Sequence, residues 1–116
     1  MSKKNVAVVM GGYSDEYVVS LKSGQLIYDS LDREIYNVYK VVVLRDEWYF
    51  VDENNHKISI NKGDFSVVLS DNSTLKFDVC FNIIHGKPGE NGELQAYWDT
   101  IGQKYTGCNF YQSALT

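Results

Sequence analysis

Two glycine-containing segments hold the residues whose types and spacing could support ligand binding or catalysis. The first, Gly11-Gly12-Tyr13-Ser14-Asp15-Glu16, follows a short apolar run. Its glycines allow the backbone to approach a ligand closely, and the two acids at its end would attract a cation. Because those acids stand where a helix start would otherwise favour a phosphate, the segment predicts a site for a ligand ammonium group. The alternative is a tight turn followed by acids that cap a helix.

The second segment is the loop His85-Gly86-Lys87-Pro88-Gly89-Glu90-Asn91-Gly92, which directly follows an apolar stretch. Its histidine is expected at the end of a strand, where it either supports chemistry or is a satisfied structural group. His56 stands in a polar turn and is expected to be exposed. Cys80 and Cys108 have no neighbouring histidine that would activate a thiolate. The acids near the loop lack the tight spacing of metal ligands, so no metal site is predicted.

The apolar pattern predicts the elements that hold these segments. The continuous apolar run at 6–10 is typical of a strand buried on both faces. Residues 77–84 form a further apolar run that ends at the second segment. Apolar residues at 21–31 and 94–101 repeat at the spacing of one helical face. Gly24 lies on the first of these faces, where it would allow the helix to approach the sheet closely.

Strand, glycine turn and helix thus occur twice, which predicts an α/β fold. The expected architecture is Rossmann-like, with a mainly parallel sheet flanked by helices and an antiparallel ribbon inserted between the two units. Ligands bind beyond the carboxyl ends of the strands in such sheets, so both glycine turns should open on one edge. The remaining expected elements are strands at 38–44, 48–51, 57–60, 65–69 and 104–107, a helix end at Gly102, and a helix start at 109–115.

Composition restricts the class of protein. The chain has 116 residues, 44% of them hydrophobic and 14% aromatic, which is typical of one folded domain rather than of a disordered segment. A formal net charge of -4 without a basic cluster argues against nucleic-acid binding. No apolar run approaches the ~18 residues of a membrane span, and no secretory signal is visible. Two cysteines make no disulfide framework, so a reducing cytoplasm is expected.

Together, the two segments resemble the N-terminal, pre-ATP-grasp domain of D-alanine–D-alanine ligases. The family pattern G-G-x-S-x-E-x-x-V-S-L stands here as residues 11–21, and H-G-x-x-G-E-D-G stands as residues 85–92. A later Y-x-G and S-A-L stand at 105–107 and 113–115, in the family's order. The matching motifs lie at both ends of the chain, whereas the segment 48–69 matches none of them.

Three positions depart from the family pattern. Val18 stands where a second acid is usual, Asn91 where aspartate is usual, and Cys108 where serine is common. These departures concern hydrogen bonding in the loops and leave the resemblance intact.

The resemblance implies a reaction that supplies peptidoglycan synthesis. ATP phosphorylates the carboxylate of one D-alanine, and the amine of a second D-alanine attacks the acyl phosphate to give the dipeptide. Glu16 would hold the ammonium group of the first D-alanine, Val19 would line that pocket, and His85 would lie beside it in a supporting catalytic role. Three further motif residues are expected at the substrate site: Gly11, Gly12 and Ser20.

No nucleotide-binding motif stands in these residues. The resemblance therefore implies that ATP and Mg²⁺ bind in the ATP-grasp subdomains that follow this domain in the family. Residues 1–116 are interpreted as the N-terminal, substrate-side domain of a longer enzyme, predicted to fold but to be inactive alone.

The resemblance also implies a homodimer to which this domain contributes. The supply of aromatic residues, nine Tyr, five Phe and two Trp, exceeds what one small core easily absorbs and points the same way. Two other functions stay open. One is a stand-alone amino-acid-binding or dimerisation module of the same fold, and the other is a ligase that joins D-alanine to D-lactate.

Overall fold

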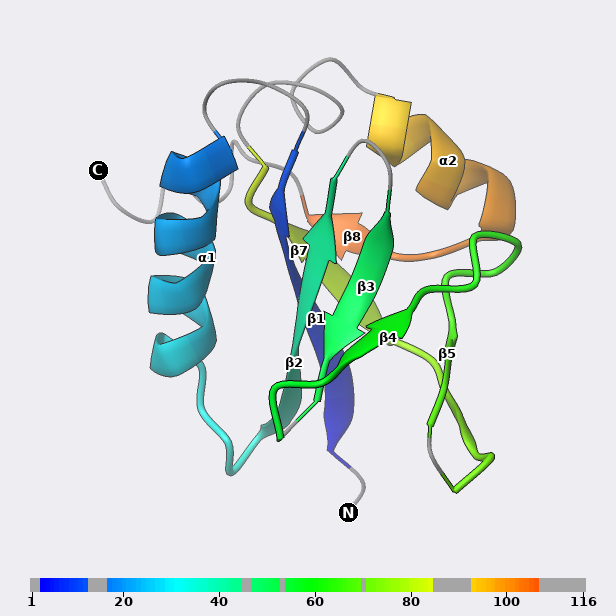
Figure 1. Ribbon diagram of the computed structural model, residues 1–116, viewed down its shortest axis with the longest axis horizontal. Coiled ribbons are helices and arrows are strands. Elements are labelled where there is room, and N and C mark those ends of the chain that lie inside the picture. The colour runs from blue at the N-terminus through cyan, green and yellow to red at the C-terminus, as the bar shows by residue number, and fades with distance from the viewer. Residues whose placement is uncertain are drawn as a thin grey trace.

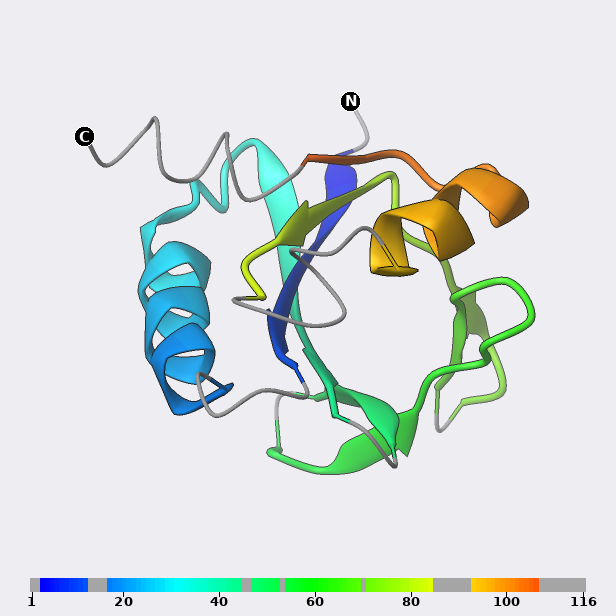
Figure 2. The ribbon, with the colours of Figure 1, turned by 90° about the horizontal axis from the view of Figure 1, so that it is seen from above.

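The computed structural model describes residues 3–12, 17–44, 47–52, 54–69, 71–84 and 93–106. Within them lie a six-stranded sheet, a helix on each face of it, and a separate two-stranded hairpin (Figures 1 and 2). The strands are β1 (Lys4–Gly11), β2 (Tyr36–Val43), β3 (Trp48–Val51), β4 (Lys57–Ser59), β5 (Val67–Val68), β6 (Thr74–Leu75), β7 (Val79–Asn82) and β8 (Tyr105–Thr106), and the helices are α1 (Tyr17–Ser30) and α2 (Glu93–Ile101).

The order of strands in the sheet is β4-β3-β2-β1-β7-β8. Strands β2, β1, β7 and β8 run parallel, whereas β3 and β4 continue the sheet as an antiparallel ribbon. The predicted α/β architecture is thereby confirmed, including its ribbon. The chain builds one side of β1 first, with β2, and returns later to add β7 on the other side. The boundary between β1 and β7 is therefore the topological switch point of the sheet.

The central strand β1 is buried on both faces, as its continuous apolar run predicted. Ala7 and Val9 belong to the core cluster that contains α2 residues. Val8 and Met10 belong to a second cluster, packed against α1. Alternate side chains of a strand point to opposite faces, so β1 contributes to two separate cores.

Helix α1 packs on the sheet through the helical face that the sequence predicted. The side chains on this face are Leu21, Ile27 and Tyr28, joined beyond the helix end by Leu31. Gly24 is buried on the same face, and a Cβ there would lie 2.7 Å from the Cβ of Met10. The missing side chain thus allows the close approach that was expected. Arg33 follows the helix and donates hydrogen bonds to the carbonyl oxygens of Tyr28 and Leu31.

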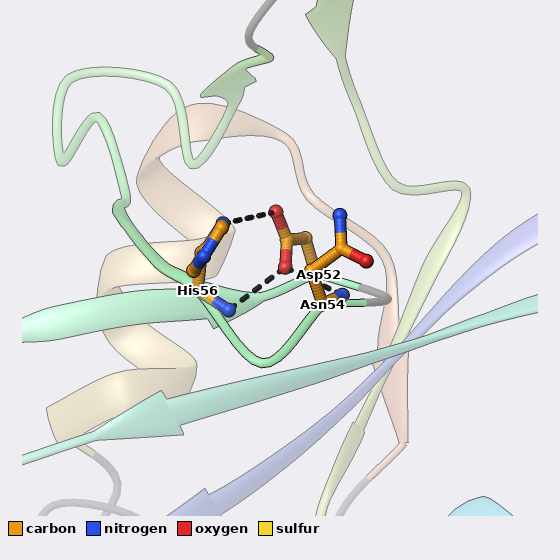
Figure 3. A network of polar contacts seen from close by, with 3 residues as sticks. All are labelled: Asp52, Asn54 and His56. Atoms are coloured by element: carbon orange, nitrogen blue, oxygen red, sulfur yellow. Dashed lines mark hydrogen bonds and ion pairs between the residues drawn. The ribbon is translucent and has the colours of Figure 1, made fainter.

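The turn between β3 and β4 is organised by Asp52. Its Oδ1 accepts hydrogen bonds from the backbone N–H groups of Asn54, at 2.9 Å, and His56, at 2.8 Å (Figure 3). The Nδ1 of His56 lies 3.7 Å from Oδ2 of Asp52, and the histidine side chain is 75% exposed. His56 is therefore an exposed turn residue, as predicted.

The hairpin of β5 and β6 lies on the α2 face of the sheet (Figure 2). The sequence predicted one strand at 65–69 and missed β6, because two residues carry no periodic signal. Phe65 precedes β5 with a φ of 58°, a left-handed conformation that is rare for a bulky residue. Its N–H donates to the carbonyl of Asn61 at 2.7 Å, and its side chain is fully buried.

Helix α2 ends at Gly102, as predicted. The φ of Gly102 is 76°, and its N–H donates to the carbonyl of Asp99 at 3.3 Å. The N–H of Gln103 donates to the carbonyl of Trp98 at 2.8 Å. These two bonds form a Schellman motif, which satisfies carbonyl groups that the helix end would otherwise leave unpaired.

Aromatic rings fill the core beneath α2. The ring of Phe65 lies edge-on to four others, with centroid distances from 5.6 to 6.1 Å. Those four rings belong to Trp48, Phe77, Tyr97 and Trp98. Of these rings, Phe65, Phe77 and Trp98 are buried, whereas Trp48 and Tyr97 are only partly buried. The homodimer to which the supply of aromatic residues pointed stays a prediction.

The boundaries of the other strands differ only slightly from their predictions. β2 begins two residues before the predicted start, β7 is shorter than the predicted 77–84, and β8 lies within 104–107. The helix start predicted at 109–115 lies outside the described residues. Of the two helices in the described ranges, neither is long and apolar enough to cross a membrane.

Candidate functional site

Gly11 and Gly12 form the carboxyl end of the central strand. Their φ angles of 106° and 104° are values that residues with side chains rarely adopt. A Cβ on Gly11 would lie 2.7 Å from the carbonyl oxygen of Val43 in β2. The N–H of Gly12 donates to that same oxygen at 2.6 Å. Glycine is therefore required for β1 to end against β2 in this conformation.

Ser20 joins three elements at this carboxyl edge. The residue lies in the first turns of α1 and is fully buried. Its Oγ accepts a hydrogen bond from the N–H of Gly11 at 3.0 Å and donates one to the carbonyl of Ile83 at 2.8 Å. Since Gly11 ends β1 and Ile83 directly follows β7, one hydroxyl links α1 to both strand ends. The structure places this hydroxyl against backbone groups, and its predicted contact with substrate stays a prediction.

Val19 is the neighbour of Ser20 on α1 and has the opposite environment. It is 54% exposed, and Val18 beside it is 44% exposed. The side chain of Val19 thus lies exposed near the start of α1. The contact of Val19 with a substrate stays a prediction.

Glu16 and His85 lie outside the described residues. Their chain neighbours are described, because Tyr17 begins α1 and Ile84 lies two residues beyond the end of β7. The parallel pairing of β1 with β7 brings the carboxyl ends of the two strands to one edge of the sheet. This arrangement supports a common site for the two segments. The positions of Glu16 and His85 themselves stay predictions.

Asn82, the last residue of β7, was missed as a residue of this edge. Its side chain is fully buried, and its Oδ1 accepts a hydrogen bond from the N–H of Ile84 at 3.2 Å. Asn82 thus fixes the backbone immediately before His85. The sequence feature that could have identified Asn82 is that it is the single amide in the apolar run 77–84. A buried amide needs hydrogen-bond partners, so it is expected to organise the nearby backbone.

Cys80 has no catalytic environment. The side chain of Cys80 is fully buried in the core. Burial raises the pKa of its thiol, which disfavours the reactive thiolate. The small, buried, apolar role predicted for Cys80 fits this environment, whereas Cys108 lies outside the described residues. Across the ranges that the structure describes, no three His, Cys, Asp or Glu side chains are grouped as metal ligands would be.

A cavity of about 450 Å³ lies away from the carboxyl edge. Residues of β2, β3 and the hairpin region line it, among them Tyr39, Phe50, Asp52 and Asp71. Because β3 runs antiparallel to β2, the turn that begins at Asp52 lies toward the amino ends of the parallel strands. Of the described residues predicted for the substrate site, Gly11, Gly12, Val19 and Ser20, none lines this cavity.

Comparisons with known proteins identify relatives over nearly the whole chain. The family model for the D-ala D-ala ligase N-terminus matches residues 5–108. The D-alanine–D-alanine ligase of Flavobacterium psychrophilum is 58% identical over 97% of this chain and 34% of its own length.

Two solved structures have the same fold. The D-alanyl-alanine synthetase A of Vibrio cholerae has a TM-score of 0.75 at 26% identity, over 91% of this chain and 31% of that one. The VanG D-Ala:D-Ser ligase of Enterococcus faecalis has a TM-score of 0.73 at 25% identity, over 90% and 35%.

The chain spans about a third of the length of the curated relatives it matches. The family match includes the Gly11–Gly12 turn, the segment that begins at His85, and the sheet that holds both. On this match and on the identity to the Flavobacterium ligase, the chain belongs to the D-ala D-ala ligase N-terminus family.

Proposed function

We propose that the full-length protein is a D-alanine–D-alanine ligase and that these residues form part of its site for the first D-alanine. The observation that carries this proposal is the family match over residues 5–108, together with 58% identity to the Flavobacterium enzyme. The match includes the two motif segments that follow adjacent parallel strands. An enzyme of this activity would supply the dipeptide for peptidoglycan synthesis in the cytoplasm.

The substrate site is proposed to lie at the carboxyl edge between β1 and β7. Glu16 would hold the ammonium group of the first D-alanine through a charge-assisted hydrogen bond. Val19, whose side chain is exposed, would line the pocket. Gly11 and Gly12 would let the backbone approach the substrate, and His85 would support the reaction from the segment after β7.

ATP and Mg²⁺ are proposed to bind outside these residues. Among the described side chains, no group of three acids, histidines or cysteines is arranged to hold a metal ion. ATP would supply the phosphoryl group that activates the carboxylate of the first D-alanine. The part played by this chain is therefore to bind and orient that amino acid, and the ATP-grasp part of the full-length protein would hold the nucleotide.

The proposal is tested by assaying the full-length protein with ATP, Mg²⁺ and D-alanine. We expect phosphate release that depends on D-alanine, with the dipeptide identified by mass spectrometry, and none with L-alanine. The 116-residue chain in the same assay should release no phosphate above background. D-alanine binding by the full-length protein without any dipeptide would contradict the proposal and favour a binding module.

The second substrate needs its own measurement, because a D-Ala:D-Ser ligase is among the structural neighbours at 25% identity. D-Alanine should serve as the first substrate, and D-alanine, D-serine and D-lactate should compete as the second substrate in the same reaction. We expect D-alanyl-D-alanine as the main product. A main product that contains D-serine or D-lactate would assign the protein to a related ligase of the same fold.

A further inference from the structure

The hydroxyl of Ser20 takes the place of one backbone hydrogen bond between β1 and β7. Val9 pairs with Asn82 in the parallel ladder, and the N–H of Ile83 donates to the carbonyl of Val9 at 2.9 Å. In a regular parallel ladder, the next bond would run from the N–H of Gly11 to the carbonyl of Ile83. Both of these groups are bonded to the Oγ of Ser20 instead, at 3.0 and 2.8 Å.

The inserted hydroxyl suits both of its partners. A serine hydroxyl can accept and donate at once, so it satisfies the N–H of one strand and the carbonyl of the other. Ser20 is fully buried, which leaves these backbone groups without solvent as a substitute. An apolar side chain at this position would therefore leave them unpaired, or the two strands would have to close until they bond directly.

The same hydroxyl determines where the two strands separate. Up to Val9, β1 and β7 are joined by backbone hydrogen bonds, and from Gly11 onward a side chain of α1 stands between them. The N–H of Gly12 is directed away from β7, since it donates to Val43 in β2. The strands thus part at the switch point, where ligands bind in sheets of this type.

We propose that Ser20 is a positioning residue, which sets the spacing between the carboxyl ends of β1 and β7, the strands that precede the segments with Glu16 and His85. This inference rests on the proposed function, because the two segments are taken to share the first D-alanine. In this proposal the hydroxyl acts through the backbone of Gly11 and Ile83, and this role replaces the direct substrate contact predicted from the motif. Its loss disturbs the D-alanine site and leaves the binding of ATP intact.

The test compares Ser20→Ala with Ser66→Ala in the full-length protein. Ser66 is a matched control, because it is also a buried serine whose hydroxyl donates a hydrogen bond, here to Asp64 at 2.6 Å, in the turn before β5. We expect Ser20→Ala to lower kcat/KM for D-alanine by about 10–100-fold while the KM for ATP stays unchanged. Ser66→Ala should alter neither constant. Equal effects of the two substitutions, or a parental kcat/KM in Ser20→Ala, would overturn the proposal.

A second variant covers the case in which Ser20→Ala does not fold. Ser20→Cys keeps the size of the side chain and replaces a strong hydrogen-bonding group by a weak one, so it should show the same selective loss. Parental kinetics in a folded Ser20→Cys protein would then overturn the proposal.

Hydrogen exchange separates failure of this inference from failure of the proposed function. If the unaltered full-length protein makes no dipeptide, the proposed function fails, and the exchange rate of the Gly11 N–H, which donates to Ser20, decides the role of Ser20. We expect Ser20→Ala or Ser20→Cys to speed exchange in peptides that cover 9–12, and Ser66→Ala to leave it unchanged. Unchanged exchange in the Ser20 variants would show that the hydroxyl does not hold the strands.

Discussion

Met10 of β1 lies directly beneath Gly24 of α1, so closely that a Cβ on the glycine would lie 2.7 Å from the Cβ of Met10. The thioether of Met10 can move, but its Cβ is fixed to the strand. Any side chain at position 24 must therefore move the helix away from the sheet.

Gly24→Ala should consequently destabilise the chain. Alanine favours a helix interior by about 1 kcal/mol over glycine, but overpacking a core costs about 1–3 kcal/mol. We expect a net loss of up to about 2 kcal/mol in the free energy of unfolding, measured by denaturant titration. Lys22→Ala, at an exposed position of the same helix, should change it by less than about 0.5 kcal/mol. A Gly24→Ala chain more stable than the parent would contradict the close packing.

At position 65, glycine should be tolerated better than alanine. Either substitution removes the buried ring of Phe65, at a cost of about 3–5 kcal/mol. The φ of 58° then favours glycine, which adopts left-handed backbone without strain. We expect Phe65→Gly to unfold at a higher denaturant concentration than Phe65→Ala, the reverse of the usual order within an element. The usual order would show that position 65 leaves the left-handed region once the ring is gone.

Tyr97 should make stability fall at alkaline pH. Burial raises the pKa of Tyr97 to about 12, and the negative charge of Asp64 adds to the shift. In the unfolded chain a tyrosine ionises near its ordinary pKa of 10.0. The stabilisation from the protonated ring is therefore complete below pH 10 and is lost as the pH rises from 10 toward 12.

The hydroxyl of Tyr97 donates to the carbonyl of Lys62 at 2.6 Å, a bond that needs the proton. Tyr97→Phe should therefore cost about 1 kcal/mol at pH 7 and flatten the loss of stability above pH 10. The measurement is denaturant unfolding at a series of pH values. Parallel loss of stability in parent and variant between pH 10 and 12 would contradict this assignment.

Glu16→Gln in the full-length protein should weaken binding of the first D-alanine. The substitution keeps the size of the side chain and removes the charge that would pair with the substrate ammonium group. The loss of a charge-assisted hydrogen bond is worth roughly 1.5–3 kcal/mol, or about ten- to a hundredfold in affinity. Steady-state kinetics would show this as a raised KM for D-alanine at the first site. Glu34→Gln, an exposed acid just before β2, is the control and should leave the KM unchanged.

The full-length protein should be a homodimer to which this domain contributes. The main warrant is the family, and the supply of aromatic residues is a secondary hint. Light scattering at several concentrations should give twice the monomer mass. A monomer mass up to high micromolar concentration would contradict the prediction, whatever state the 116-residue chain adopts.

Local patterns were sufficient to predict most of the fold. The continuous run at 6–10 was typical of a strand buried on both faces, and the spacing of Leu94, Tyr97 and Trp98 gave the inward face of α2. β6 could not be predicted, because Thr74 and Leu75 pair with β5 only through the geometry of a turn.

The candidate site was predicted less completely than the fold. The motif identified Ser20 as a site residue, but its role depends on the register of β7, far along the chain. Its hydroxyl bridges backbone groups at the ends of β1 and β7. The pairing of these two strands cannot be predicted from a local sequence pattern. The left-handed backbone of Phe65 was equally hidden, since a phenylalanine is not expected there and only the buried ring explains it.

The two faces of β1 differ in how far along the chain their partners lie. Val8 and Met10 share a cluster mainly with α1 and β2, which follow β1 directly, and with Ile83 after β7, whereas Ala7 and Val9 share theirs with rings from β3, the hairpin region and α2. Contacts between distant segments require longer loops to close and form more slowly. During synthesis on the ribosome, α1 can cover its side of β1 and β2 as soon as β2 emerges, before Ile83 completes that cluster. The aromatic face must stay open until Trp98 has left the exit tunnel, so the nascent chain exposes its most apolar surface on that one side.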